Sequence, residues 1–236
     1  MLLVLILVVV TGSYVLLRSL NEAAQRNRDT QAGTAASLAL AERALLGYAI
    51  RFPDDPAIIS RDTGPGLLPC PDTRFDSGDV PGQADPPCAI SSSTETGLLP
   101  WRSLDVPDLR DGAGAPLWYA LANAFRNNPA GTVNPSTLAA LRVDDCAAGA
   151  RQVAALVFAP GAALGNQNRS TASATARYNP ANYLEGENAS RGDGCFSSAT
   201  GASANDFVRV IDRAQLLDAV QRRVLSDVAN ALGRYY

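Results

Sequence analysis

The sequence lacks lysine and histidine altogether, and its 20 basic residues are all arginine. This excludes Schiff-base lysines, phosphate-loop lysines, histidine general bases and histidine-ligated metals. Serine nucleophiles have no partner base, so we expect no catalytic activity. The net charge is −3, with 23 acidic residues. Because such a balance provides no basic surface, we also expect no binding to DNA or RNA.

An unbroken apolar run stands at the N-terminus of the sequence. Residues 1–10 read MLLVLILVVV, and the first charged residue is Arg18. A helix over residues 1–17 is about 25 Å long, slightly short of the ~20 residues that a bilayer core requires. No basic residue precedes the run and no small-residue cleavage site follows it, so it does not match a cleaved secretory signal.

The residues after the run give two conflicting indications of compartment. Arg18, Arg26 and Arg28 follow it, and by the positive-inside rule they would place the rest of the chain in the cytoplasm. Four cysteines and long loops rich in Pro, Gly, Ser and Thr instead suit an oxidising compartment. The two agree if a short basic leader once preceded Met1 and was removed, which makes Met1 the first residue of a processed protein.

The helical pattern continues well beyond the apolar run. Residues 19–52 contain no proline, and from Leu38 apolar residues recur at spacings of three and four. Residues 21–34 are polar, and Pro53 supplies the stop. We therefore predict one helix over residues 1–52, whose form suits packing against copies of itself or against other helices.

With these features the chain resembles a type IV pilin or a type II secretion pseudopilin. In that family a basic leader is cut off before an apolar helix, which serves first as a membrane anchor and then as the filament core. Residues 111–119, DGAGAPLWY, are similar to the family's D-P-W-G-x-P-x-x-Y loop, without its Pro and Trp. GLLPCPD at 66–72 and GLLPW at 97–101 are similar to loop signatures of a larger-headed subgroup.

The resemblance implies roles for two N-terminal residues. Met1 would be N-methylated after processing and would act in assembly. The fifth residue is usually a glutamate, whose charge meets the N-terminal amine of a neighbouring subunit. Here Leu5 stands in its place, a departure that some minor subunits tolerate.

Residues 53–236 are predicted to form a globular α+β head, with a small antiparallel sheet packed on the N-terminal helix. We expect strands over residues 152–159 and 207–211. A C-terminal helix begins at Asp212, with Gln215 completing a variant capping box, and ends at Gly233. Helical spacing over residues 115–126 predicts a further helix, and residues 164–206 are expected to form a surface loop.

The cysteines are Cys70, Cys88, Cys146 and Cys195, without a C-x-x-C pair. We expect two disulfides, and zinc held by four thiolates is the alternative. Pairing Cys70 with Cys88 and Cys146 with Cys195 closes the shortest loops, each worth roughly 3–4 kcal/mol in the chain-entropy model. The sequence leaves the pairing open.

Other candidate sites each have a simpler structural interpretation. Asp72, Asp76 and Asp79 could bind calcium in a flexible loop, or form a solvated acidic turn. The protease-like triplet at residues 62–64 is expected to be a loop, and Glu185 with Glu187 a turn rather than paired catalytic carboxylates. Trp101, Trp118 and Tyr119 are expected in the core rather than on a sugar-stacking surface.

These observations favour a structural subunit of a type IV pilus-like filament, extracellular or periplasmic, that self-assembles through residues 1–52. The resemblance places it in the inner membrane before pilus or secretion machinery assembles it into the filament. We expect no cofactor apart from the calcium considered above. One alternative is a minor tip or initiating pseudopilin with a ligand-binding head. Another is a single-pass membrane-anchored periplasmic binding protein that does not polymerise.

Overall fold

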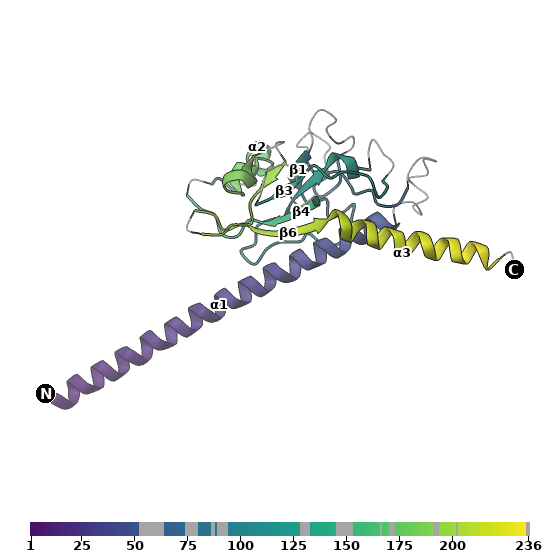
Figure 1. The fold of residues 1–236 in the computed structure, drawn as a ribbon. Helices are drawn as coiled ribbons and strands as arrows, with labels where there is room; N and C mark the ends of the chain where they lie inside the picture. Colours follow the sequence, from purple (N-terminus) through teal and green to yellow (C-terminus); the bar gives the residue numbers. More distant parts are fainter. Residues whose placement is uncertain are drawn as a thin grey trace.

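A computed structural model describes residues 1–51, 64–73, 80–85, 88, 94–127, 133–144, 153–165, 167–169, 173–190, 194–201 and 203–234, without the side chains of residues 2–5, 8 and 174. The fold is α+β, as the sequence predicts (Figure 1). Its elements in chain order are α1 (Leu2–Arg51), β1 (Thr94–Leu98), β2 (Trp118–Ala122), η3 (Asn123–Phe125), β3 (Arg142–Val143), β4 (Val153–Ala159), α2 (Ala174–Arg177), η4 (Pro180–Asn182), η5 (Gly186–Ala189), β5 (Cys195–Phe196), β6 (Phe207–Asp212) and α3 (Arg213–Leu232).

The N-terminal segment forms one helix of 50 residues, α1, which confirms the predicted rod. At 1.5 Å per residue the helix is about 75 Å long. Its described side chains are exposed up to residue 33, and Thr34 is the first buried one. We call residues 1–33 the free half and residues 34–51 the seat. Figure 1 shows the free half extending far beyond the head.

A four-stranded antiparallel sheet in the order β1-β2-β4-β6 forms the centre of the head. Every residue of β2 and β4 is buried. Both strands read as continuous apolar runs, WYALA and VAALVFA, which is the pattern of strands covered on both faces.

The helix predicted over residues 115–126 is wrong, because this segment contains strand β2 and the short helix η3. In β2 Trp118 pairs with Leu98 on one side and with Phe158 on the other. Since nearly every side chain here is buried, apolar residues occupy all positions, and three-residue spacings arise without a helix.

One face of the sheet packs on α1. Directly opposed residues of antiparallel strands share a face, so Tyr119, Val157 and the next alternate residue, Leu121, point to the same side. Tyr48 of α1 lies close enough to Tyr119 to add to the increase in the pKa of its phenol, although burial is the larger cause. The seat therefore covers this face.

Tyr183 and Phe196 cover the opposite face. The Tyr183 ring packs on Trp118 and the Phe196 ring on Phe158, each with its centroid 5.3 Å away. The prediction of a surface loop over residues 164–206 is therefore wrong in part, because the segment contains α2, η4, η5, β5 and buried anchors. These anchors are isolated aromatic and amide residues within a polar sequence, so no periodic pattern reveals them.

The C-terminal strand and helix match the prediction in position but not in capping. Strand β6 extends one residue further than expected, and Gly233 is the C-cap of α3. Asp212 is the N-cap, yet its side chain makes no capping hydrogen bond. Gln215 donates from Nε2 to Oε1 of Glu42 (2.8 Å) in α1. The predicted capping box is therefore wrong, since Gln215 joins two helices instead.

Candidate assembly helix and its seat on the head

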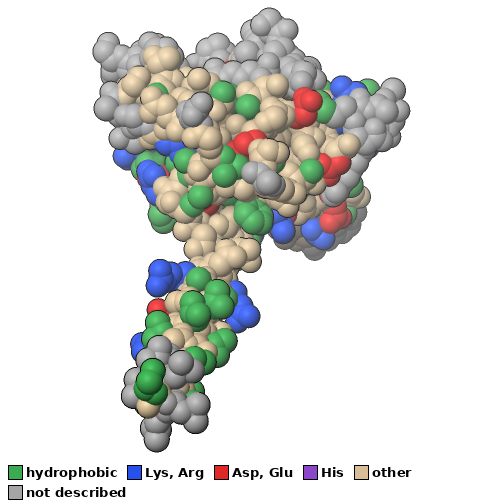
Figure 2. Space-filling model, turned by 90° about the vertical axis from the view of Figure 1, so that its left-hand side faces the viewer, with side chains coloured by type: hydrophobic (Ala, Val, Ile, Leu, Met, Phe, Trp, Pro, Cys, Tyr) green, Lys and Arg blue, Asp and Glu red, His purple; other side chains and the backbone are tan. Residues whose placement is uncertain are grey.

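The free half carries large apolar side chains on every side. On the face of the stem that Figure 2 shows, hydrophobic groups lie beneath the head, with basic groups beside them. The exposed residues are Met1, Ile6, Leu7, Val9, Val10, Tyr14, Val15, Leu16, Leu17 and Leu20, and each is at least 53% exposed. Because residues 14–17 are consecutive, their side chains cover a full turn of the helix. One partner helix would cover only a stripe of such a surface.

Leaving this surface in water is costly. Burying one large apolar side chain contributes about 1.5–3 kcal/mol, so ten that are roughly half exposed represent on the order of 10 kcal/mol. That is comparable to the net stability of a typical domain. Covering this surface is therefore favourable. Among the residues that the structure describes, no helix has an apolar stretch long enough to cross a membrane.

The seat is fixed to the head by apolar packing around one buried carboxylate. Its buried apolar side chains are Leu38, Ala41, Leu45, Tyr48 and Ala49. Glu42 lies among them, 7% exposed. Its Oε2 accepts from Nε and Nη2 of Arg209 in β6, both at 2.6 Å, and its Oε1 accepts from Gln215 in α3. One side chain thus joins α1 to both β6 and α3.

Sequence reasoning missed Glu42, although a signal was present. An acidic residue on the apolar face of an amphipathic helix indicates a buried partner, because an unpaired buried carboxylate is costly. Glu42 follows Ala41 and precedes Leu45 by three residues, which places it on that face. The partner, Arg209, is 167 residues away in sequence and could not be identified from spacing.

The residues that resemble the pilin loop form a tight turn at residues 111–116. Asp111 Oδ1 accepts from the amides of Ala113 (2.9 Å) and Ala115 (2.8 Å), and its Oδ2 accepts from the amide of Gly161 (2.7 Å). Gly114 has a φ of 84°, a conformation that favours glycine. The turn therefore depends on the Asp and Gly of the motif and joins two loops of the head.

This turn contacts α1 where the seat begins. The Gly112 amide donates to Oγ1 of Thr34 (2.9 Å). A Cβ atom on Gly112 would lie 2.0 Å from the carbonyl oxygen of Thr30, so only glycine allows this approach. The helix is consequently held by the head up to Thr30, and the rest of the free half extends beyond it.

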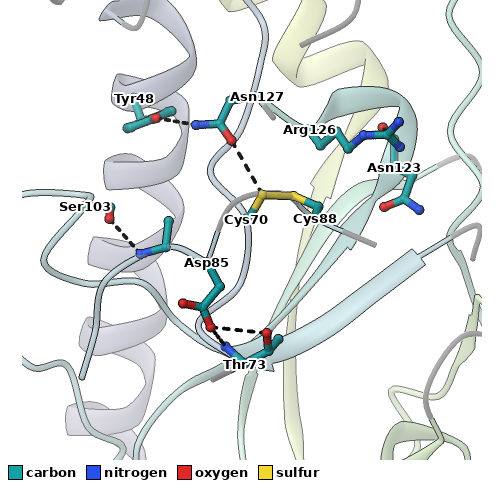
Figure 3. The surroundings of a disulfide bond; sticks show 10 residues. Tyr48, Cys70, Thr73, Asp85, Cys88, Ser103, Asn123, Arg126 and Asn127 are labelled. Atoms are coloured by element: carbon teal, nitrogen blue, oxygen red, sulfur yellow. Dashed lines mark hydrogen bonds between the residues drawn. A yellow bond between two sulfur atoms is a disulfide. The ribbon is translucent and has the colours of Figure 1, made fainter. Parts of the chain in front are cut away.

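Cys70 and Cys88 form a disulfide, one of the pairings that the sequence leaves open, and this disulfide connects to the seat through Asn127 (Figure 3). Asn127 donates from Nδ2 to the hydroxyl of Tyr48 (2.7 Å), and its Oδ1 lies 3.7 Å from Cys70 Sγ. The disulfide loop, the end of η3 and α1 therefore meet at one amide group.

The second predicted disulfide is only partly visible. Cys195 is disulfide-bonded, whereas Cys146 lies outside the described residues. Because Cys70 and Cys88 are bonded to each other, a zinc site of four thiolates is wrong for this chain.

Of the three residues of the predicted calcium site, the structure describes Asp72. Asp72 is fully buried, and its Oδ2 accepts from the Gly82 amide (2.7 Å). Asp76 and Asp79 lie outside the described residues. Within the described ranges no group of three or more His, Cys, Asp or Glu residues is placed to hold a metal ion. Calcium binding therefore stays a prediction.

The other candidate residues that the structure describes lie in the core, in loops or at the surface. Trp118 and Tyr119 are buried in the core, as expected, and Trp101 is half-buried. Glu185 accepts from Nε2 of Gln167 (2.6 Å) and from the amide of Asn205 (3.0 Å), so it connects loops. Glu187 is exposed, and residues 62 and 63 lie outside the described part.

No protein-family model matches the chain, and neither a curated protein nor a solved structure shows significant similarity to it.

Proposed function

We propose that this chain is a structural subunit of a type IV pilus-like filament, assembled through the free half of α1. The observation that carries the proposal is that α1 has two different halves. Its free half is apolar on every side near the N-terminus, while its seat is fixed to the head by Glu42 and the 111–116 turn. A surface of this kind suits surroundings of several helices, which a filament core provides.

Assembly exchanges one apolar environment for another. Before assembly the apolar residues of the free half lie in the membrane, and in the filament they lie among neighbouring helices. The burial of apolar surface is maintained in this exchange, so helix packing and hydrogen bonding decide the balance. The free half spans about 50 Å, enough for each helix to contact several neighbours along a filament axis.

The polar zone of the free half separates this core from the heads. Arg18 and Arg26 both lie near Glu22, with N–O distances of 3.0 and 3.8 Å. Such exposed pairs contribute little to stability, so the zone is held mainly by the continuity of the helix. It keeps the head at a distance from the apolar core, where it remains accessible on the filament surface.

A membrane-anchored head that does not polymerise is the second candidate, because lipid alone would also cover the apolar residues. The two candidates differ in whether copies of α1 contact one another. A minor tip subunit would show the same contacts at low abundance.

Replacing Leu17 by Arg tests the proposal. Leu17 is 63% exposed and lies well before Thr30, where the head meets α1, so the head should keep its thermal transition. A charge inside the helical core is expected to lower incorporation into sheared filaments at least tenfold. The matched control is Leu138→Arg on the head, where Leu138 is 68% exposed. Incorporation of Leu17→Arg at the level of Leu138→Arg would contradict the proposal.

A further inference from the structure

A cavity of about 550 Å³ lies in the head. Among the residues that line it are Trp101, Arg110, Leu117, Arg169, Arg177 and Tyr183. Its walls come from the 111–116 turn on one side and from the segment after β4 on the other. The volume falls within the range of ~300–1,000 Å³ that is typical of small-molecule sites.

Three arginines, Arg110, Arg169 and Arg177, line the cavity together with Tyr183. Burial raises the pKa of this phenol, and the positive charges of Arg169, Arg177 and Arg110 lower it in part. Residues far apart in sequence therefore line one cavity. Arg169 also has its Cζ 5.3 Å from the Tyr183 ring centroid.

Arg110 is already neutralised. Asp108 Oδ2 accepts from its Nε (3.0 Å) and Nη2 (2.6 Å). The other carboxylate of the wall, Asp72, accepts from the Gly82 amide. Arg110 and Asp108 therefore contribute no net charge to the cavity, and the remaining charged groups of the wall are Asp72, Arg169 and Arg177, two guanidinium groups against one carboxylate.

Arg169 is held rigidly but keeps its charge. Its hydrogen bonds to described residues all go to neutral oxygens, namely the carbonyls of Gly161 (2.6 Å), Asn182 (3.1 Å) and Tyr183 (3.1 Å) and Oε1 of Gln167 (2.7 Å). Four hydrogen bonds fix the orientation of the guanidinium group. A cation that is fixed in place and not neutralised by an acid attracts an anion to the cavity wall.

Arg177 has no such partners. The half-buried guanidinium group lies 5.4 Å from the Tyr178 ring centroid, and no described residue accepts a hydrogen bond from it or pairs with its charge. Its five N–H donors are therefore available to an oxyanion. Such a group prefers bidentate contact with a carboxylate or a phosphate.

We propose that this cavity binds a small organic molecule carrying a carboxylate or phosphate group. The oxyanion contacts Arg177, in the field of Arg169, and the body of the molecule lies along the aliphatic and aromatic wall that includes Leu117 and Trp101. This site is built only from head residues. The inference goes beyond the filament proposal and does not rest on it.

Calorimetric titration of the full chain in detergent tests the inference with three ring-sized probes: glucuronate, glucose 1-phosphate and glucose. At least one anionic probe is expected to bind and glucose is not. Binding should weaken as sodium chloride is raised, because screening reduces attraction to the guanidinium groups. Absence of binding by both anionic probes, or equal binding of glucose, would overturn the proposal.

Two variants test the residues. Arg177→Gln is expected to weaken anion binding at least tenfold, while Arg222→Gln on α3, which removes an exposed pair with Asp218, leaves it unchanged. Ala163→Glu places an acid at an exposed position of the wall, so binding should be lost while the fold is kept. Anion binding that survives in both Arg177→Gln and Ala163→Glu would locate the ligand elsewhere and reject this site.

Discussion

The Asp206 carboxyl group is buried beside Glu185, and its Oδ2 accepts hydrogen bonds from Nδ2 of Asn188 (3.0 Å) and from the Glu185 amide (3.1 Å). Burial raises the pKa of this group from 3.8 to about 7. The two hydrogen bonds lower the pKa in part, and the neighbouring Glu185 carboxylate raises it. The folded protein therefore favours a protonated Asp206.

The stability of the head should consequently fall as the pH rises from about 4 to about 7. In this range the folded state binds a proton at Asp206 that the unfolded chain has released, so the stabilisation is complete below pH 3.8 and is lost through pH 7. Asp206→Asn keeps an oxygen that can accept the same hydrogen bonds. It is expected to flatten this dependence and to stabilise the head at pH 8, by on the order of 2 kcal/mol.

Denaturant unfolding at pH 4.5, 6 and 8 measures this effect. The matched control is Asp218→Asn on α3, where the carboxylate is exposed and pairs only with Arg222. If wild-type protein and Asp206→Asn showed the same pH dependence, the assignment of the titration to Asp206 would be wrong.

At the scale of residues, a contact could be predicted from the sequence where its two partners are close together in the chain. The Cys70–Cys88 disulfide spans 18 residues and was the shortest closure available to Cys70. Arg177, by contrast, matters because it lies beside Tyr183 and Arg110, and no spacing in the sequence indicates that they converge. The polar composition of residues 164–206 concealed the cavity wall.

At the scale of elements, α1 and β2 show which patterns predict structure. The rod was predictable because 34 consecutive residues without proline and a clear amphipathic half have one interpretation. Strand β2 was not, because WYALA is buried on both faces and its strand form comes from pairing with β1 and β4. Tertiary pairing decided what local spacing could not.

The joint between α1 and the head should depend on Glu42. Glu42→Ala removes the acceptor for Arg209 and Gln215 and is expected to lower the free energy of unfolding of the head by about 2 kcal/mol. Glu42→Gln keeps the shape and one acceptor, so its cost is about 1 kcal/mol. Chemical denaturation of the full chain in detergent measures both.

Glu22→Ala is the matched control, because Glu22 lies on the same helix and pairs with Arg18 in solvent. Little change is expected there. Equal destabilisation by Glu42→Ala and Glu22→Ala would show that the seat is held by apolar packing alone.

At the scale of the whole molecule, the head and the free half differ in how their apolar side chains are covered. The head has its own buried sheet and a disulfide, whereas residues 1–20 form a helix whose described side chains are exposed and mostly apolar. This division was visible in the sequence as a change from an apolar run to loops with cysteines. The surroundings of the free half consist of other molecules, so the sequence of one chain does not specify them.

Helical reconstruction of filaments sheared from cells that produce this chain is the most direct test of the assembly proposal. The account predicts filaments containing the chain, with residues 1–20 packed between copies in the core and the heads outside. Shearing that releases no filament containing the chain, or a reconstruction with residues 1–20 on the filament surface, would contradict it.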